Sequence, residues 1–262
     1  MKRVISGAVA IPLVVGIVLY GPPWLFFALV SILMLIACHE YFSMISEVGI
    51  KGFPILSMVL SFFLLLVFST DGRFAPEWGL LTLLSLFVAW FVRENNLRIA
   101  IDQISFSLLG ILYVGGLSGY FLLLSDLENG RHLILFLFLV IWAGDSAAYY
   151  VGRSKGKKYL ALKVSPGKTW EGAYAGVAGN LVAAILSKFW FLQTLSLVHC
   201  LIAALICGII GQFGDLAESL LKRNTGVKDS GTLIPGHGGV LDRIDSLLFA
   251  GPALYCYCKL FL

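Results

Sequence analysis

Long apolar runs alternate with short polar breaks along most of this chain. A helix needs about 20 apolar residues to cross the ~30 Å hydrocarbon core of a bilayer. Breaks such as GPP at 21–23, DGRFAPE at 71–77 and ENG at 128–130 separate several of the runs. The pattern predicts nine membrane-spanning helices, at roughly 4–20, 24–46, 53–69, 78–92, 104–125, 132–152, 171–188, 195–221 and 244–262.

Composition supports the membrane class. Of the 262 residues, 59% are hydrophobic and 13% are charged, whereas a soluble domain carries about 25% charged residues. We therefore expect an all-α, polytopic integral membrane helix bundle that forms a single domain over 1–262. Residues 1–131 carry no assigned motif, and residues 132–262 hold the candidate catalytic helices and the cytoplasmic loops. The five cysteines have no metal-binding spacing and lie mostly in apolar runs, which indicates buried, unreactive thiols.

The basic residues predict an orientation. If the N-terminus is cytoplasmic, nine spans place 15 of the 19 Lys and Arg residues on the cytoplasmic side, as the positive-inside rule requires. Two predicted cytoplasmic loops are notable: 153–170, with six basic residues and no acid, and 222–243. A basic loop beside a membrane by itself indicates only topology and attraction to anionic lipid.

Acidic residues near the ends of the spans indicate a site, because ionisable side chains within a bilayer are costly. At ~1.5 Å of rise per residue, these acids lie within roughly 10–12 Å of the predicted cytoplasmic helix ends. Glycines at 208, 211 and 214 would let neighbouring helices approach closely. Each acid alone could form a structural ion pair, but together they predict one shared site. They are Asp145, Glu171, Asp215, Glu218, Asp242 and Asp245.

The residue types favour phosphate chemistry. Clustered carboxylates without a Cys/His set suit Mg²⁺ or a similar hard cation. A metal site beside Lys and Arg side chains is typical of phosphoryl or nucleotidyl transfer. In GHGG, 236–239, the missing side chains would let backbone N–H groups approach a phosphate. PGKT, 166–169, is not a phosphate-binding loop of the Walker type, because Leu162 stands where that motif requires glycine. The neighbouring bases are Lys168, Lys222, Arg223, Lys228 and Arg243.

Two histidine positions leave alternatives open. His237 is a candidate general base, a phosphate hydrogen-bond donor, or a residue that fixes the loop. His39 and Glu40 stand near the cytoplasmic end of the second span. They are either side chains that reach the site or polar residues of a helix interface, and the interface interpretation is favoured.

The segment SLLKRNTGVKDSGTLIPGHGGVLDRID, 219–245, resembles the signature of the phosphatidate cytidylyltransferase family, the CDP-diacylglycerol synthases. A second segment, SPGKTWEG at 165–172, looks like another motif of that family, although Gly167 stands where the family often has lysine. The specific resemblance covers the chain from about residue 140. The matching signature positions are Ser219, Lys222, Arg223, Lys228, Asp229, Gly231, Leu233, His237, Gly238, Gly239, Asp242, Arg243 and Asp245.

The resemblance implies that CTP and phosphatidic acid react to give CDP-diacylglycerol and pyrophosphate, with Mg²⁺ and with or without a second cation. It implies a homodimer in contact with membrane lipids and not with nucleic acid, in a bacterial inner membrane with the active site facing the cytoplasm. The implied catalytic residues are Asp215, Lys222, Arg223, Lys228, Asp229, His237, Asp242, Arg243 and Asp245. The implied substrate-binding residues are Ser165, Lys168, Thr169, Glu171, Ser219, Gly238 and Gly239. Within this site, we expect Asp215, Asp242, Asp245 and Asp145 to be the metal ligands.

Two other functions are compatible with parts of this pattern. A CTP-dependent membrane lipid kinase would use similar residues, but it would need a base to deprotonate an alcohol, a role for His237. A transporter for an anionic substrate should carry polar residues toward the bilayer midplane and at both faces. Here the polar residues gather on one predicted side, which argues against transport.

Overall fold

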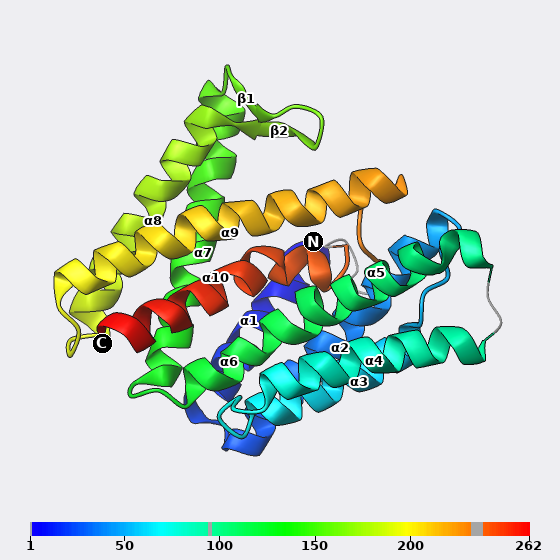
Figure 1. Cartoon of the computed structure of the whole chain (residues 1–262). Coiled ribbons are helices and arrows are strands. Elements are labelled where there is room, and N and C mark those ends of the chain that lie inside the picture. The colour runs from blue at the N-terminus through cyan, green and yellow to red at the C-terminus, as the bar shows by residue number, and fades with distance from the viewer. Residues whose placement is uncertain (1, 94–95, 232–237) are drawn as a thin grey trace. The chain divides into compact units, whose positions relative to one another are not determined.

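A computed structural model describes residues 2–93, 96–231 and 238–262, with side chains from residue 10 onward (Figure 1). Helices dominate, as the apolar runs predict. The elements are α1 (Lys2–Tyr20), α2 (Pro23–Glu47), α3 (Pro54–Phe68), α4 (Ala75–Val92), η1 (Leu97–Ile99), α5 (Ala100–Gly110), η2 (Ile111–Gly116), α6 (Leu117–Ser125), α7 (Gly130–Lys155), β1 (Tyr159–Ala161), β2 (Ser165–Thr169), α8 (Trp170–Trp190), α9 (Leu197–Thr225) and α10 (Leu241–Phe261).

The chain forms two compact units, and each draws on early and late parts of the sequence. Unit 1 contains Met1–Ile17, Gly21–Leu123 and Asn224–Arg243, and unit 2 contains Val18–Tyr20, Leu124–Arg223 and Ile244–Leu262. The segment 224–243, which holds much of the family signature, therefore folds with the N-terminal helices. The predicted organisation as one domain, with a change of role at residue 131, stays a prediction.

Within unit 1, α2 is anchored firmly in the core. The helix starts directly after Pro22, with Pro23 in its first turn, a position that suits proline because no intrahelical N–H bond is lost there. Tyr41 is fully buried, and its hydroxyl donates to the carbonyl of Phe106 at 2.9 Å. A Cβ at Gly110 would lie 2.6 Å from the Tyr41 ring, so the α5 segment can approach α2 only with glycine there. These contacts hold the C-terminal half of α2 in place.

The structure confirms an all-α, polytopic membrane protein. Among the described residues, six helical stretches are long and apolar enough to cross a bilayer. They are Pro23–Glu47, Ala75–Val92, Leu97–Ser125, Gly130–Lys155, Trp170–Trp190 and Leu197–Thr225. Apolar side chains on α4 such as Leu80 and Phe91 are 61% and 71% exposed, which suits a lipid-facing helix. The stretches Ala10–Tyr20 and Pro54–Phe68 are shorter. The total of nine spans and the cytoplasmic N-terminus stay predictions.

Within unit 2, α7 and α8 are joined by a β-hairpin where the sequence indicated only a basic loop (Figure 1). Strands β1 and β2 pair antiparallel, with Tyr159 opposite Thr169 and Ala161 opposite Ser165. Glu171 closes the hairpin, because its Oε2 accepts from the backbone N–H groups of Lys157 at 3.1 Å and Lys158 at 3.3 Å. The hairpin gives the basic segment a defined shape.

Candidate active site

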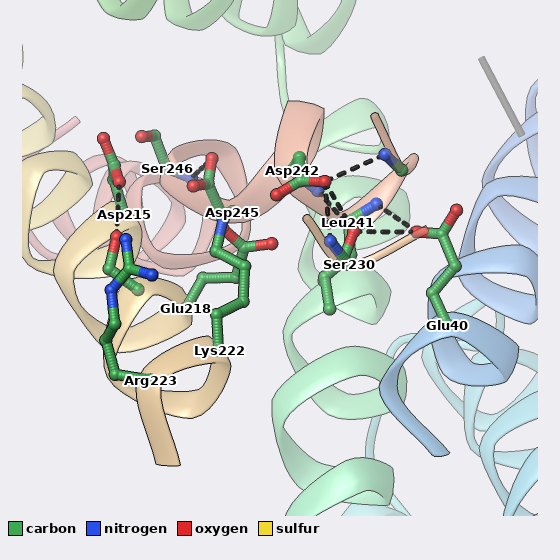
Figure 2. Close-up of polar contacts among 12 residues, drawn as sticks. Glu40, Asp215, Glu218, Lys222, Arg223, Ser230, Leu241, Asp242, Asp245 and Ser246 are labelled. Atoms are coloured by element: carbon green, nitrogen blue, oxygen red, sulfur yellow. Dashed lines mark hydrogen bonds and ion pairs between the residues drawn. The ribbon is translucent and has the colours of Figure 1, made fainter. Parts of the chain in front are cut away.

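The acidic and basic side chains of α9 form one stripe at the charged end of unit 2. Asp215 Oδ2 lies 2.7 Å from Lys168 Nζ, and Glu218 Oε2 lies 2.6 Å from Lys222 Nζ. Ser219 Oγ is 3.4 Å from Asp215 Oδ1. Figure 2 shows Asp215, Glu218 and Lys222 along this helix. The two acids differ in accessibility, because the Glu218 side chain is 1% exposed and the Asp215 side chain is 36% exposed. Asp215 and Lys168 are therefore the pair that solvent or a substrate can reach.

The hairpin brings Lys168, one of the predicted phosphate-binding bases, to α9. Lys168 stands on β2, and Arg223 at the end of α9 donates from Nε to the carbonyl of Val164 at 3.2 Å. Thr169 caps α8 by accepting from the Gly172 N–H at 3.2 Å. Thr169 and Glu171 thus have structural contacts in the hairpin, and their predicted role in substrate binding stays a prediction. Ser165, at the start of β2, is half-buried.

Close packing of α9 on α10 brings Asp245 into the same unit. A Cβ at Gly214 would lie 2.5 Å from the backbone oxygen of Asp245, so this approach requires glycine, as predicted. Asp245 is 8% exposed, and its Oδ1 accepts from the Ser246 N–H at 2.7 Å. Its carboxylate is close enough to those of Asp215 and Asp145 for mutual repulsion, and Lys222 attracts it. Unit 2 therefore brings together three of the four acids predicted to hold a metal.

A small cavity lies beside these acids in unit 2. Its volume is about 10 Å³, enough for about one water molecule. Asp145, Asn180 and Gln212 line it, together with Ile141, Gly144, Ala148, Gly208 and Gly211. Asn180 is 2% exposed, and its Oδ1 has no hydrogen-bond partner. Asn180 is not among the residues predicted from the sequence, although an amide within the apolar run 171–188 is a usable signal.

Asp242 belongs to unit 1, where it binds the backbone of the glycine-rich segment. Its Oδ2 accepts from Ser230 N at 2.9 Å, Ser230 Oγ at 2.9 Å and Gly239 N at 2.8 Å (Figure 2). Gly238 has φ +81°, a left-handed conformation that favours glycine. Lys228, Asp229 and Arg243 are exposed. His237 and Leu233 lie outside the described residues.

The predicted metal site can be tested against the donors present. In the part of the chain that the structure describes, no three His, Cys, Asp or Glu side chains are arranged to hold an ion. Mg²⁺, however, is usually bound by one or two carboxylates together with water and substrate phosphates. The neighbouring acids Asp215, Asp245 and Asp145 and the unpartnered oxygen of Asn180 are hard donors that fit this requirement. The metal assignment, including Asp242, stays a prediction.

Comparison with known proteins decides the family. Residues 1–261 match the Cytidylyltransferase family. The chain belongs to this family. Two similar proteins, both named phosphatidate cytidylyltransferase, cover almost the whole chain. The one from Synechocystis sp. is 33% identical over an alignment of 290 residues including gaps, which covers 100% of this chain and 97% of the relative. The one from Bacillus subtilis is 34% identical over 265 residues, which span 99% and 98%.

A third protein of that name, from Haemophilus influenzae, is 48% identical over 131 residues, which span 48% of this chain and 46% of the relative. The predicted resemblance to this family is thus confirmed. As a member of the cytidylyltransferase family, the chain is a nucleotidyltransferase.

Proposed function

We propose that this enzyme transfers the cytidylyl group of CTP to phosphatidic acid, producing CDP-diacylglycerol and pyrophosphate. The observation that carries the proposal is the family match over residues 1–261, with relatives named phosphatidate cytidylyltransferase that align along nearly the whole chain. The site supports it with acids for a metal and bases for phosphates in one unit.

The reaction places its main demand on electrostatics. A phosphate oxygen of phosphatidic acid attacks the α-phosphorus of CTP, a new P–O bond forms, and the bond to the pyrophosphate oxygen breaks. The nucleophile is already an anion at neutral pH, so no strong general base is needed. The enzyme must instead hold two anions together and stabilise the charge that develops on the leaving group.

The bases of unit 2 are suited to this task. Lys168 is partly exposed and is held beside Asp215 until a phosphate competes for it. Arg223 presents the rest of its guanidinium while its Nε is fixed to Val164. Lys222 reaches the same stripe from a more buried position beside Glu218. We propose that these three side chains bind phosphate oxygens. The roles of Lys228 and Arg243, which belong to unit 1, in binding phosphate stay predictions.

Mg²⁺ is the proposed cofactor. Asp215 and Asp245 would hold it, with Asp145 beside them. Asp242, the other predicted ligand, belongs to unit 1, and its part in metal binding stays a prediction. When bound, the ion neutralises charge on the triphosphate and on the departing pyrophosphate. Asp215 is paired with Lys168 here, so a metal ion held by Asp215 would leave this lysine available to a phosphate oxygen.

We also propose that the enzyme acts at the cytoplasmic face of a bacterial inner membrane. The distribution of basic residues between the predicted loops supports this orientation. The site must then open toward the cytoplasmic leaflet, because the acyl chains of the lipid substrate cannot enter water. Assembly as a homodimer is part of the same proposal.

Labelled CTP tests the reaction. Purified protein in detergent is mixed with phosphatidic acid, Mg²⁺ and CTP that carries the label on either the α- or the γ-phosphorus. We expect label to enter the lipid phase only from the α-phosphorus. Label from the γ-phosphorus alone would show a lipid kinase instead, and no transfer from either would overturn the proposal. Omission of phosphatidic acid is the matched control.

A further inference from the structure

The buried acid Glu40 on α2 makes contacts that its place in an apolar helix does not explain. Glu40 is 5% exposed. Its Oε1 accepts from the Val240 N–H at 2.9 Å. Its Oε2 accepts from the Leu241 N–H at 2.8 Å and lies 3.2 Å from Ser230 Oγ (Figure 2). Both carboxylate oxygens are therefore directed at the segment that carries the family signature, some 200 residues away in sequence.

These contacts meet a requirement of α10. The first N–H groups of any helix have no intrahelical acceptor, and a buried N–H without a partner is destabilising. Val240 and Leu241, at the start of α10, are 5% and 0% exposed, so solvent water does not accept hydrogen bonds from their N–H groups. A carboxylate at this position satisfies both donors and also interacts favourably with the positive end of the helix.

Ser230 joins Glu40 to Asp242. Its hydroxyl lies 2.9 Å from Asp242 Oδ2 and 3.2 Å from Glu40 Oε2, and it has one proton to donate between them. The N–H of Asp242 donates back to Ser230 Oγ at 3.3 Å. The ends of the segment on either side of residues 232–237 are thus tied to each other and to α2.

The signature glycines leave room for this arrangement. A Cβ at Gly231 would lie 2.6 Å from Glu40 Oε1, and its three nearest atoms all belong to Glu40. A Cβ at Gly239 would lie 2.5 Å from Glu40 Oε2 and would also overlap Ser230 Oγ. Any larger residue at either position would displace the carboxylate.

We propose that Glu40 is a positioning residue for the nucleotidyl transfer. It fixes the start of α10, and through Ser230 it fixes Asp242 and the neighbouring Arg243. The buried Tyr41 anchors the same helical turn, so α2 provides a rigid base. The N-terminal helices carry no recognisable motif, and in this proposal α2 supports the start of α10. The kinetic part of the test rests on the proposed function, whereas the structural part does not.

The first experiment compares Glu40→Gln with Glu47→Gln, an exposed acid at the end of the same helix. The glutamine keeps one acceptor oxygen but turns an amide toward a backbone N–H. We expect kcat to fall about 100-fold, as for other small displacements of reacting groups, with KM for CTP within about threefold and an unchanged pH profile. Glu47→Gln should match the wild type. A wild-type kcat in Glu40→Gln, or loss of the acidic limb of its pH profile, would overturn the positioning role.

The second experiment tests the contact itself through a double-mutant cycle of Glu40→Ala and Gly231→Ala. Alone, Gly231→Ala should lower kcat about tenfold or more, because the added methyl group would overlap the carboxylate of Glu40. In the Glu40→Ala background the same change should have little further effect. Additive losses would show that the two residues act independently and would overturn the proposal.

Hydrogen–deuterium exchange of the peptide 238–245 gives a readout independent of activity. We expect exchange at Val240 and Leu241 to speed up at least about tenfold in Glu40→Gln and to remain slow in Glu47→Gln. Unchanged exchange in Glu40→Gln would overturn the positioning role. If the wild type produces no CDP-diacylglycerol, the proposed function fails, and this exchange measurement still decides whether Glu40 holds the segment.

Discussion

Two groups of carboxylates in this enzyme are satisfied in different ways. In unit 1, Glu40 and Asp242 accept hydrogen bonds from backbone N–H groups and one serine hydroxyl. In unit 2, Asp215 and Glu218 are paired with lysines. Backbone donors cannot move away without unfolding a segment, whereas a lysine can exchange one anion for another. The first arrangement is therefore suited to holding a shape, and the second to binding phosphates and a metal.

The largest expected effect comes from Asp215→Asn. This change removes an accessible carboxylate of the unit 2 site and leaves the buried core intact, so we expect about a 1,000-fold loss of kcat with an unchanged melting temperature. Asp71→Asn is the control, because Asp71 also forms an ion pair, with Arg73, but both side chains are mostly exposed. Near-normal turnover by Asp215→Asn would contradict the proposal that the lysine-paired carboxylates of unit 2 bind the metal ion.

Lys168→Met should lower kcat/KM for CTP about 100-fold. The substitution keeps an apolar side chain of similar length but removes the charge proposed to bind a phosphate oxygen. Lys168→Arg should recover part of the loss. Lys188→Met, near the other end of α8, should behave as the wild type. Equal effects of the two methionine substitutions, measured by lipid labelling, would contradict a specific role for Lys168.

Ser230→Ala should have a smaller effect, about tenfold on kcat, because the neutral hydroxyl supports two carboxylates that keep their backbone donors. The exposed Ser46, on the same helix as Glu40, provides the control variant Ser46→Ala. A loss as large as that of Asp215→Asn would show that the hydroxyl contacts a reacting group.

Thr169→Ala should affect stability more than activity. The threonine accepts the Gly172 N–H at the start of α8, and loss of such a cap costs about 1 kcal/mol. We expect a melting temperature a few degrees lower in detergent and turnover within about twofold of the wild type. A large loss of turnover at unchanged stability would instead support the predicted contact of Thr169 with substrate.

The helices were predictable because their signals are local. Apolar runs mark α2 and α9, and breakers such as Pro54 and the ENG sequence before α7 mark where helices begin. The acidic stripe of α9 was predictable for the same reason, since helical spacing places Asp215 and Lys222 on one face. Gly214 also indicated the close approach that brings Asp245 to α9.

Contacts between distant segments were not predictable. The β-hairpin depends on pairing of Tyr159 with Thr169 and on closure by Glu171, neither of which appears in an apolar pattern. Glu40 was noticed, but a polar residue of a helix interface was the favoured interpretation. Its partners Val240 and Leu241 contribute backbone N–H groups, which every residue except proline has. The sequence therefore gives no sign that these two residues bind Glu40.

Direct metal binding tests the difference between the two units most sharply. Mn²⁺, as a probe for the proposed Mg²⁺ site, is titrated into the purified wild type, Asp215→Asn and Glu40→Gln, and the free ion is measured by electron paramagnetic resonance. We expect Asp215→Asn to bind Mn²⁺ at least about tenfold more weakly and Glu40→Gln to bind as the wild type does. Weakened binding in Glu40→Gln with normal binding in Asp215→Asn would contradict the proposal that the metal ion is held in unit 2 and that Glu40 only positions the start of α10.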